Sequence, residues 1–136
     1  MKFYIASSIK NYRQVRQLSD KLKEAGWMQT FDWTMHLSEE LNSDFLRDLG
    51  QMEFDGVKEA DVVILLTPGG KGTHTELGMA IALNKTVYLC HEDHTYFEDN
   101  NNTSTFYWLP QINRLNGIID VIAMNIIYPG GKQTVN

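Results

Sequence analysis

Apolar residues along the chain fall into short runs that predict the strands of a buried sheet. Residues 60–68, ADVVILLTP, are the clearest run, because Val62 to Leu66 are five consecutive apolar residues between Asp61 and Pro68. Such a run is typical of a parallel strand buried on both faces. Shorter apolar runs predict four further strands, at residues 2–6 (KFYIA), 27–33 (WMQTFDW), 85–90 (KTVYLC) and 109–115 (LPQINRL).

The segments between these runs have the spacing of helices. Val15, Leu18, Leu22 and Ala25 repeat every three or four residues, and Gly26 is expected to end that helix. Further helices are predicted at residues 37–60, 74–84 and 116–127. The second is expected to begin near Ser38 and to be divided at Gly50. Residues 91–105 form a long polar loop that is expected to be functional or mobile, and residues 128–136 a frayed tail.

Alternating strands and helices predict one α/β domain over residues 1–136, with a doubly wound, parallel, five-stranded sheet. Ligands of such sheets bind beyond the carboxyl ends of the strands. Three loops end there, and their residues can meet in one cleft: ASSIKN after the first strand, TPGGKGTHTE after the third and the polar loop after VYLC.

Composition narrows the classes of ligand. The 136 residues carry a net charge of −5. This charge argues against a nucleic-acid binder, which is expected to be basic, but it is compatible with binding of a small anionic ligand. A single cysteine, Cys90, excludes an intramolecular disulfide and a cysteine-based zinc site. No apolar run has the length of a signal peptide core or a membrane span. We therefore expect a cytoplasmic protein that binds neither nucleic acid nor membranes.

The glycine-rich loop is the first candidate for chemistry. Gly69, Gly70 and Gly72 precede a predicted helix and allow close approach of a ligand and positive φ angles. Free N–H groups and the positive end of the helix dipole favour a phosphate or another anion. The spacing matches neither the Walker A loop nor the dinucleotide motif G-x-G-x-x-G.

Glu76 has two competing interpretations. Thr73 and Glu76 fit a capping box, with Thr73 as N-cap, and local sequence alone favours this purely structural interpretation. It does not explain the three glycines, however. In the functional reading, Glu76 attacks a sugar carbon and a second acid protonates the leaving group. Glu53 and Asp55 are the candidates for that acid, with a solvated helix face as the alternative for both.

Three stretches resemble the nucleoside 2-deoxyribosyltransferase superfamily, including its 5′-monophosphate N-hydrolases: YIASSIK, EFDGVKEADVVILL and GGKGTHTELGMAIALNKTVYL. The resemblance covers about residues 2–90. The last stretch also resembles the PGGxGTxxE motif of cytokinin-activating phosphoribohydrolases, but their second motif, GGGxxGLMG, is missing here. The resemblance implies a flavodoxin-like or Rossmann-like homo-oligomer, a dimer or larger. It further implies a nucleoside or nucleotide substrate whose N-glycosidic bond is broken without a metal or organic cofactor.

The same resemblance implies roles for four residues. Glu76 takes the place of the nucleophile that forms a glycosyl–enzyme ester, and Tyr4 that of the tyrosine that orients it. The family usually has an aspartate eight residues before Asp61, where this chain has Glu53, with Asp55 two residues later. The identity of the general acid is therefore open between Glu53 and Asp55.

The resemblance also bears on the 5′ end of the substrate. The nucleoside transferases often bind the 5′-hydroxyl with an aspartate at the position of Gly70, whereas Ser8-Ile9-Lys10 resembles the S-I-R segment of the monophosphate hydrolases. Ser8, Lys10 and the glycine loop, including Thr73, thus favour a 5′-phosphorylated substrate, although Lys10 alone fits an ordinary surface lysine. His74 is expected to contact the phosphate or the base.

Other features favour structural interpretations. HEDH at residues 91–94 has histidines at a metal-binding spacing, but an ordinary polar loop is the commoner case, and we expect no metal. Trp33 and residues 106–108 are expected in the core or a subunit interface, with residues 104–107 as candidates for completing a neighbouring subunit's site. Two other functions stay open, a TIR-like enzyme that cleaves NAD and a non-catalytic nucleotide sensor.

Overall fold

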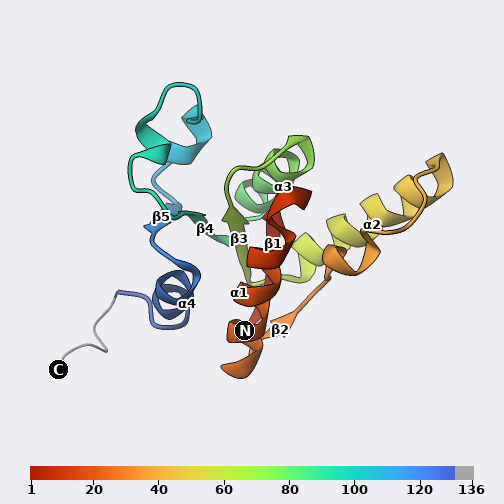
Figure 1. The fold of residues 1–136 in the computed structure, drawn as a ribbon, viewed down its shortest axis with the longest axis horizontal. Helices are drawn as coiled ribbons and strands as arrows, with labels where there is room; N and C mark the ends of the chain where they lie inside the picture. The colour runs from red at the N-terminus through yellow and green to blue at the C-terminus, as the bar shows by residue number, and fades with distance from the viewer. Residues whose placement is uncertain (131–136) are drawn as a thin grey trace.

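The computed structural model describes residues 1–130, which fold around a five-stranded parallel sheet (Figure 1). Of the predicted tail at residues 128–136, residues 131–136 lie outside the described residues. The strands are β1 (Lys2–Ser7), β2 (Met28–Gln29), β3 (Val62–Leu66), β4 (Thr86–His91) and β5 (Ile112–Asn116). The α-helices are α1 (Tyr12–Glu24), α2 (Ser43–Glu59), α3 (Lys71–Ala82) and α4 (Ile119–Ile127). Within residues 1–130 there are also four short 3₁₀ helices, η1 (Ile9–Asn11), η2 (Trp33–His36), η3 (Tyr96–Glu98) and η4 (Thr105–Trp108).

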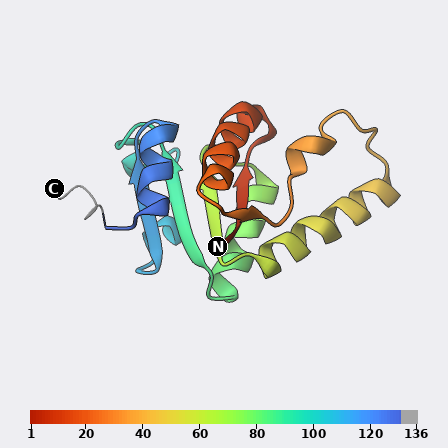
Figure 2. The same ribbon diagram turned by 90° about the horizontal axis from the view of Figure 1, so that it is seen from below.

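The strand order β2-β1-β3-β4-β5 confirms the doubly wound arrangement and is that of flavodoxin-like folds. Helices α1 and α4 lie side by side on one face of the sheet, and α2 and α3 cover the other (Figure 2). Successive strands are added on opposite sides of β1, with β2 on one side and β3, β4 and β5 on the other, so the switch point lies between β1 and β3. This switch point is where an open parallel sheet leaves a crevice for ligands.

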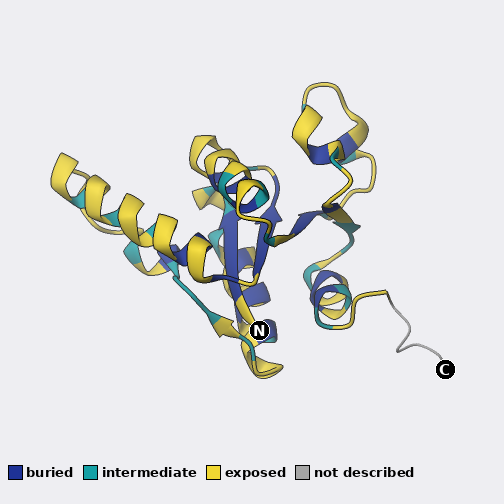
Figure 3. Cartoon of the chain, turned by 180° about the vertical axis from the view of Figure 1, so that it is seen from behind, coloured by how far each residue is buried: buried dark blue, intermediate teal, exposed yellow. Residues whose placement is uncertain are grey.

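The core lies in the central strands and on the inner faces of the helices that cover them (Figure 3). All five residues of β3 are buried, as the continuous apolar run predicts. Val15, Leu18 and Leu22 of α1 are buried as well, which confirms the helical spacing. In the described part of the chain, no helix combines the length and the apolar character needed to cross a membrane.

Several predicted boundaries are wrong. The second strand is reduced to β2, because Trp27 packs on Phe3 and the Asp32 side chain accepts a hydrogen bond from Thr34 N at 3.0 Å, which starts η2. Helix α2 begins at Ser43, where the Asn42 side chain caps it, and runs without a break through Gly50. Helix α3 begins at residue 71 rather than 74, and α4 at residue 119 rather than 116.

Helix α2 has few buried residues for its length. Only Gly56 and Val57, near its carboxyl end, are buried, and its amino-terminal half extends away from the sheet (Figures 1 and 2). Leu46, Met52 and Phe54 on this helix are exposed. Most of α2 is therefore positioned by the contacts of its last two turns.

Candidate active site

A cavity of about 520 Å³ opens at the switch point, beyond the carboxyl ends of β1 and β3. It gathers most of the residues singled out from the sequence, from four separate segments. The lining residues are Ser7, Ser8, Ile9, Lys10, Trp33, Glu53, Gly70, Gly72, Thr73 and Glu76. Gly69 adjoins this lining in the same loop, whereas Tyr4 lies behind it. Asp55 and His74 lie outside it.

Glu76 is a buried carboxyl at this cavity, held by a residue that lies behind the cavity lining. Its side chain comes from α3, and its Oε2 accepts a hydrogen bond from the Tyr4 hydroxyl on β1 at 2.6 Å. Glu76 is only 8% exposed. Burial, partly offset by the Tyr4 hydrogen bond and reinforced by the nearby Glu53, raises the pKa of Glu76 to about 7. Burial and the two carboxyls raise the pKa of Tyr4, so its hydroxyl stays protonated and remains a donor.

The capping-box reading of Glu76 is wrong. Because α3 begins at Lys71, its N-cap is Gly70 and Thr73 is the third helical residue. Thr73 Oγ1 accepts a hydrogen bond from Gly70 N at 3.2 Å, so Thr73 itself closes the first turn. Glu76 lies one turn later and faces inward. A buried carboxyl that satisfies no helix end requires another reason for its burial.

Glu53 reaches the cavity from α2 because that helix lies very close to β1. A Cβ added at Gly56 would lie 2.9 Å from the Cβ of Phe31 and 3.0 Å from a ring carbon of Tyr4. Only glycine therefore allows this approach. Glu53 lies about one turn earlier on the same face and is partly buried. Burial raises its pKa, and nearby His36 lowers it to a smaller extent.

Asp55 is not brought to the cavity. It is exposed on the outer side of α2, where its Oδ1 accepts a hydrogen bond from Gln51 Nε2 at 2.9 Å. Of the two acids proposed from the sequence, the structure places Glu53 beside Glu76.

The glycines of this loop differ in their surroundings. A Cβ at Gly69 would lie 2.4 Å from the Thr73 side chain, whereas Gly70 and Gly72 face open space. The expected positive φ angles are not found, since the described glycines with positive φ are Gly26, Gly117 and Gly130. The N–H groups of the first turn of α3 have no partners within the helix, and Gly72 and Thr73 line the cavity. This end of the cavity suits an anion.

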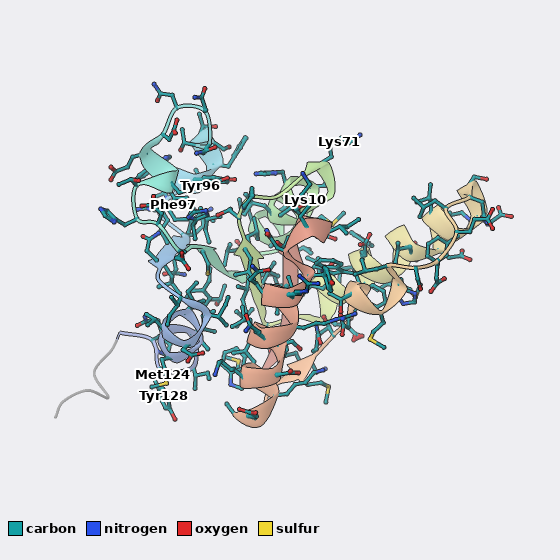
Figure 4. All side chains as sticks on the ribbon, in the orientation of Figure 1. Lys10, Lys71, Tyr96, Phe97, Met124 and Tyr128 are labelled. Atoms are coloured by element: carbon teal, nitrogen blue, oxygen red, sulfur yellow. The ribbon has the colours of Figure 1, made fainter. Side chains whose placement is uncertain are left out.

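Ser8 and Lys10 face the glycine loop across the cavity. Asn11, which sequence reasoning missed, holds their turn in place by donating to Ser7 Oγ at 2.9 Å and to Pro68 O at 3.0 Å. Lys10 and Lys71 extend at the same end of the molecule (Figure 4), so a second lysine also lies near the glycine loop. Its place in the short loop that follows the first strand is the only signal that could have identified Asn11.

Trp33 also belongs to the cavity wall, which the sequence did not predict. It is buried as expected, and its Nε1 donates to Ile5 O at 2.7 Å, which fixes the indole beside the site. Tyr107 is likewise buried, whereas Phe106 and Trp108 are exposed.

His74 does not contact this cavity. Its Nε2 lies 2.6 Å from the Tyr107 hydroxyl and its Nδ1 lies 2.8 Å from Gly70 O. The prediction of a direct contact between His74 and the substrate is thus not supported by its position. Both ring nitrogens are engaged within the protein.

The HEDH segment has ordinary local contacts. His91 stacks on Tyr96 with ring centroids 3.8 Å apart, and Asp93 accepts hydrogen bonds from Thr95. Over residues 1–130, no group of three or more histidine, cysteine, aspartate or glutamate residues is arranged to hold a metal ion.

With this geometry established, the family can be assigned. The profile of the nucleoside 2-deoxyribosyltransferase family matches residues 3–119. The chain belongs to this family. The match confirms the resemblance and extends it beyond residue 90. Membership indicates an enzyme that cleaves or transfers the N-glycosidic bond of a nucleoside or nucleotide.

One solved structure adds to the description of the fold. The CMP N-glycosidase BcmB from Clostridium botulinum is similar with a TM-score of 0.61 and 19% sequence identity, over 93% of this chain and 98% of that one. At that identity the likeness supports the fold alone. A search of curated proteins gave no match.

Proposed function

We propose that this family member breaks the N-glycosidic bond of a nucleoside 5′-monophosphate with Glu76 as the nucleophile. The observation that carries the proposal is the buried Glu76 carboxyl, held by Tyr4 at the cavity and unnecessary as a helix cap. A buried carboxyl of raised pKa in a cleft is a frequent mark of a catalytic site.

The first step forms a covalent intermediate. A Glu76 carboxylate oxygen attacks C1′ of the sugar, the bond from C1′ to the base nitrogen breaks, and its electron pair leaves with the base. Glu53 donates a proton to that base. In the second step, water or a second base attacks C1′ and returns the carboxylate of Glu76, while Glu53 accepts the proton of the incoming group. The two outcomes are hydrolysis and transfer.

The two carboxyls must share one proton before the reaction. They interact, so they titrate as a pair rather than as independent groups. Burial favours the protonated form of both carboxyls, and the hydrogen bond from Tyr4 favours the charged form of Glu76. The proposed reaction uses the state in which Glu76 is the charged nucleophile and Glu53 carries the proton.

The opposite end of the cavity supports a phosphorylated substrate. Gly70 occupies the position where the nucleoside transferases often have an aspartate that binds the 5′-hydroxyl. A carboxylate there would repel a phosphate, and glycine does not. Unpartnered amides of α3, the Ser8 hydroxyl and the Lys10 ammonium group instead offer donors and positive charge at one end of the cavity.

We also propose that the chain functions as a homo-oligomer. Exposed Leu46 on the outer half of α2 supports this, as does an apolar groove of about 470 Å³ between α3 and η4. The groove contains exposed Phe106. Light scattering coupled to size exclusion would contradict this proposal if it gave the mass of one chain at micromolar concentrations.

Base release tests the proposed activity. The protein is incubated with deoxynucleosides, nucleosides, their 5′-monophosphates and NAD, with and without an acceptor base, and the products are separated by chromatography. We expect release from a monophosphate, abolished by Glu76→Gln. Product that requires the acceptor base would indicate transfer. Nicotinamide release from NAD, or tight binding without turnover, would favour instead a TIR-like enzyme or a nucleotide sensor.

A further inference from the structure

His74 connects the glycine loop to the second half of the chain. Its Nδ1 lies 2.8 Å from the carbonyl oxygen of Gly70, and its backbone N–H donates to the same oxygen at 3.2 Å. Its Nε2 lies 2.6 Å from the hydroxyl of Tyr107, and the two rings are stacked with centroids 5.8 Å apart. Tyr107 lies 33 residues further along the chain, in η4.

Tyr107 is itself held from two other directions. Phe97 packs edge-on against its ring at 5.9 Å, and the guanidinium group of Arg114 donates to its backbone carbonyl at 2.9 Å. Tyr107 is only 2% exposed. Phe97 and its neighbour Tyr96 lie in the segment between β4 and β5, on the far side of α3 from α2 (Figure 4). The tyrosine hydroxyl is thus a fixed point for His74.

These contacts select one tautomer of His74. A carbonyl oxygen only accepts, so the Nδ1 that faces Gly70 must carry the hydrogen. In the neutral ring, Nε2 is then an acceptor and receives the hydrogen bond of the Tyr107 hydroxyl. Burial raises the pKa of Tyr107 to about 12, so its hydroxyl keeps the proton that this arrangement needs.

The two peptide groups that flank Gly70 are consequently both fixed. The Gly70 carbonyl accepts from His74, and the Gly70 N–H donates to Thr73 Oγ1 at 3.2 Å. Gly70 has no side chain to fix its orientation, and a Cβ built there would contact nothing within 4 Å. Gly70 also lines the cavity. Its orientation therefore depends on these hydrogen bonds, and the neighbouring amides depend on its orientation.

We propose that His74, held by Tyr107, is a positioning residue that orients the amides of the glycine loop toward the 5′-phosphate of the substrate. The inference rests on the proposed function for the identity of the ligand. It assigns to His74 a role through Gly70 rather than a contact with the substrate. It also gives the segment between β4 and β5 a part in the site, although none of its residues lines the cavity.

The hydroxyl of Tyr107 is the most selective point of attack. Tyr107→Phe removes one hydrogen bond and keeps the aromatic packing, and Tyr96→Phe is a matched control that removes a hydroxyl from the neighbouring aromatic cluster. For a 5′-monophosphate substrate, we expect KM to rise roughly threefold to tenfold in Tyr107→Phe, the usual cost of one hydrogen bond. We expect kcat to stay within about twofold, because the bond acts on ground-state binding. KM for the unphosphorylated nucleoside and all constants of Tyr96→Phe should stay unchanged.

A second measurement is independent of turnover. Amide hydrogen exchange over residues 69–76 should be faster in Tyr107→Phe and in His74→Phe than in the wild type, with no change in β1 or β3. Ribose 5-phosphate should slow this exchange in the wild type and less so in the variants. If the wild type hydrolysed nothing but showed this pattern, the proposed function would fail and the positioning role would stand.

Two results would overturn the positioning role. One is an equal loss of activity toward phosphorylated and unphosphorylated substrates, which indicates general damage to the fold. The other is unchanged exchange in the glycine loop of both variants.

Discussion

Helices α3 and α2 each bring a glutamate to the same cavity, but the two helices are supported very differently. Helix α3 buries Thr73, Glu76, Leu77 and Ala80 along its length, and its glutamate is held by Tyr4 of the central sheet. Helix α2 buries only two residues, and its amino-terminal half extends beyond the sheet. Glu53 is placed by the contacts of the last turns of α2, where Gly56 closely approaches Phe31 and Tyr4.

This contrast fits the two proposed roles, nucleophile for Glu76 and general acid for Glu53. A nucleophile must meet one carbon atom along one direction, which requires a fixed carboxylate. A general acid must reach different base nitrogens and begin protonated, which a partly buried position on a less supported helix allows. The comparison predicts that changes on α3 affect the chemistry itself, while changes on α2 affect proton transfer and the placement of one helix.

Among changes on α2, the largest effect is expected from Glu53→Gln. Loss of a general acid should lower kcat by about 10²–10⁴ on substrates with poorly leaving bases. The defect should shrink on a nucleotide with an N7-methylated purine, because that base carries a positive charge and leaves without a proton. Asp55→Asn, two residues away and exposed, is the control and should keep full activity. Equal loss in both variants, or a defect that is the same for both kinds of base, would remove Glu53 from the role.

The next effect concerns stability and its dependence on pH. The pKa of Glu76 is raised in the folded state from 4.5 to about 7, so the folded protein binds the proton more tightly than the unfolded chain. Stability should therefore decrease as pH rises from about 4.5 to 7. Glu76→Gln removes this pH-dependent loss of stability. The variant should therefore be more stable than the wild type at pH 8, by about 3 kcal/mol at most, with no such gain below pH 4.

Urea denaturation at pH 4 and pH 8 measures this difference. Glu59→Gln, an exposed glutamate on α2, is the matched control and should show no pH-dependent gain. A Glu76→Gln variant that is less stable than the wild type at pH 8 would contradict the claim that the buried Glu76 carboxylate destabilises the folded protein. Increased stability together with lost activity would be the mark of a residue kept for function.

The smallest effect compares two glycines of α2. Gly56→Ala should lower the free energy of unfolding by about 1–3 kcal/mol, because the new Cβ would overlap Phe31 and Tyr4. It should also lower activity by displacing Glu53. Gly50→Ala in the same helix meets nothing within 4 Å and should raise stability by up to about 1 kcal/mol with activity unchanged. Thermal denaturation and kcat for both variants decide whether the close approach at Gly56 positions α2. Indistinguishable variants would show that it does not.

The sequence predicted the sheet well because its strands are marked by local patterns. The run at Val62–Leu66 and the spacing in α1 both reflect burial that is nearly continuous or strictly periodic. Helix boundaries were less predictable. Gly50 does not break α2, because a single glycine costs only about 1 kcal/mol in a helix.

The site was predictable only where residues follow strand ends or match a family motif. The loops after β1 and β3 were placed together by topology alone. The bond from Tyr4 to Glu76 joins residues 72 positions apart, and that from Tyr107 to His74 joins residues 33 apart. No local pattern specifies such pairs. The capping box failed for the related reason that Gly70, without a side chain, begins α3 three residues earlier than expected.

Trapping the covalent intermediate tests the central claim most directly. The active 5′-monophosphate is replaced by its 2′-fluorinated analogue, which slows breakdown of a glycosyl ester, and the protein is digested and analysed by mass spectrometry. We predict the added mass of one sugar phosphate on the peptide that contains Glu76, and no adduct in Glu76→Gln. An adduct on a peptide without Glu76, or turnover of the natural substrate by Glu76→Gln at the wild-type rate, would contradict the assignment of Glu76 as nucleophile.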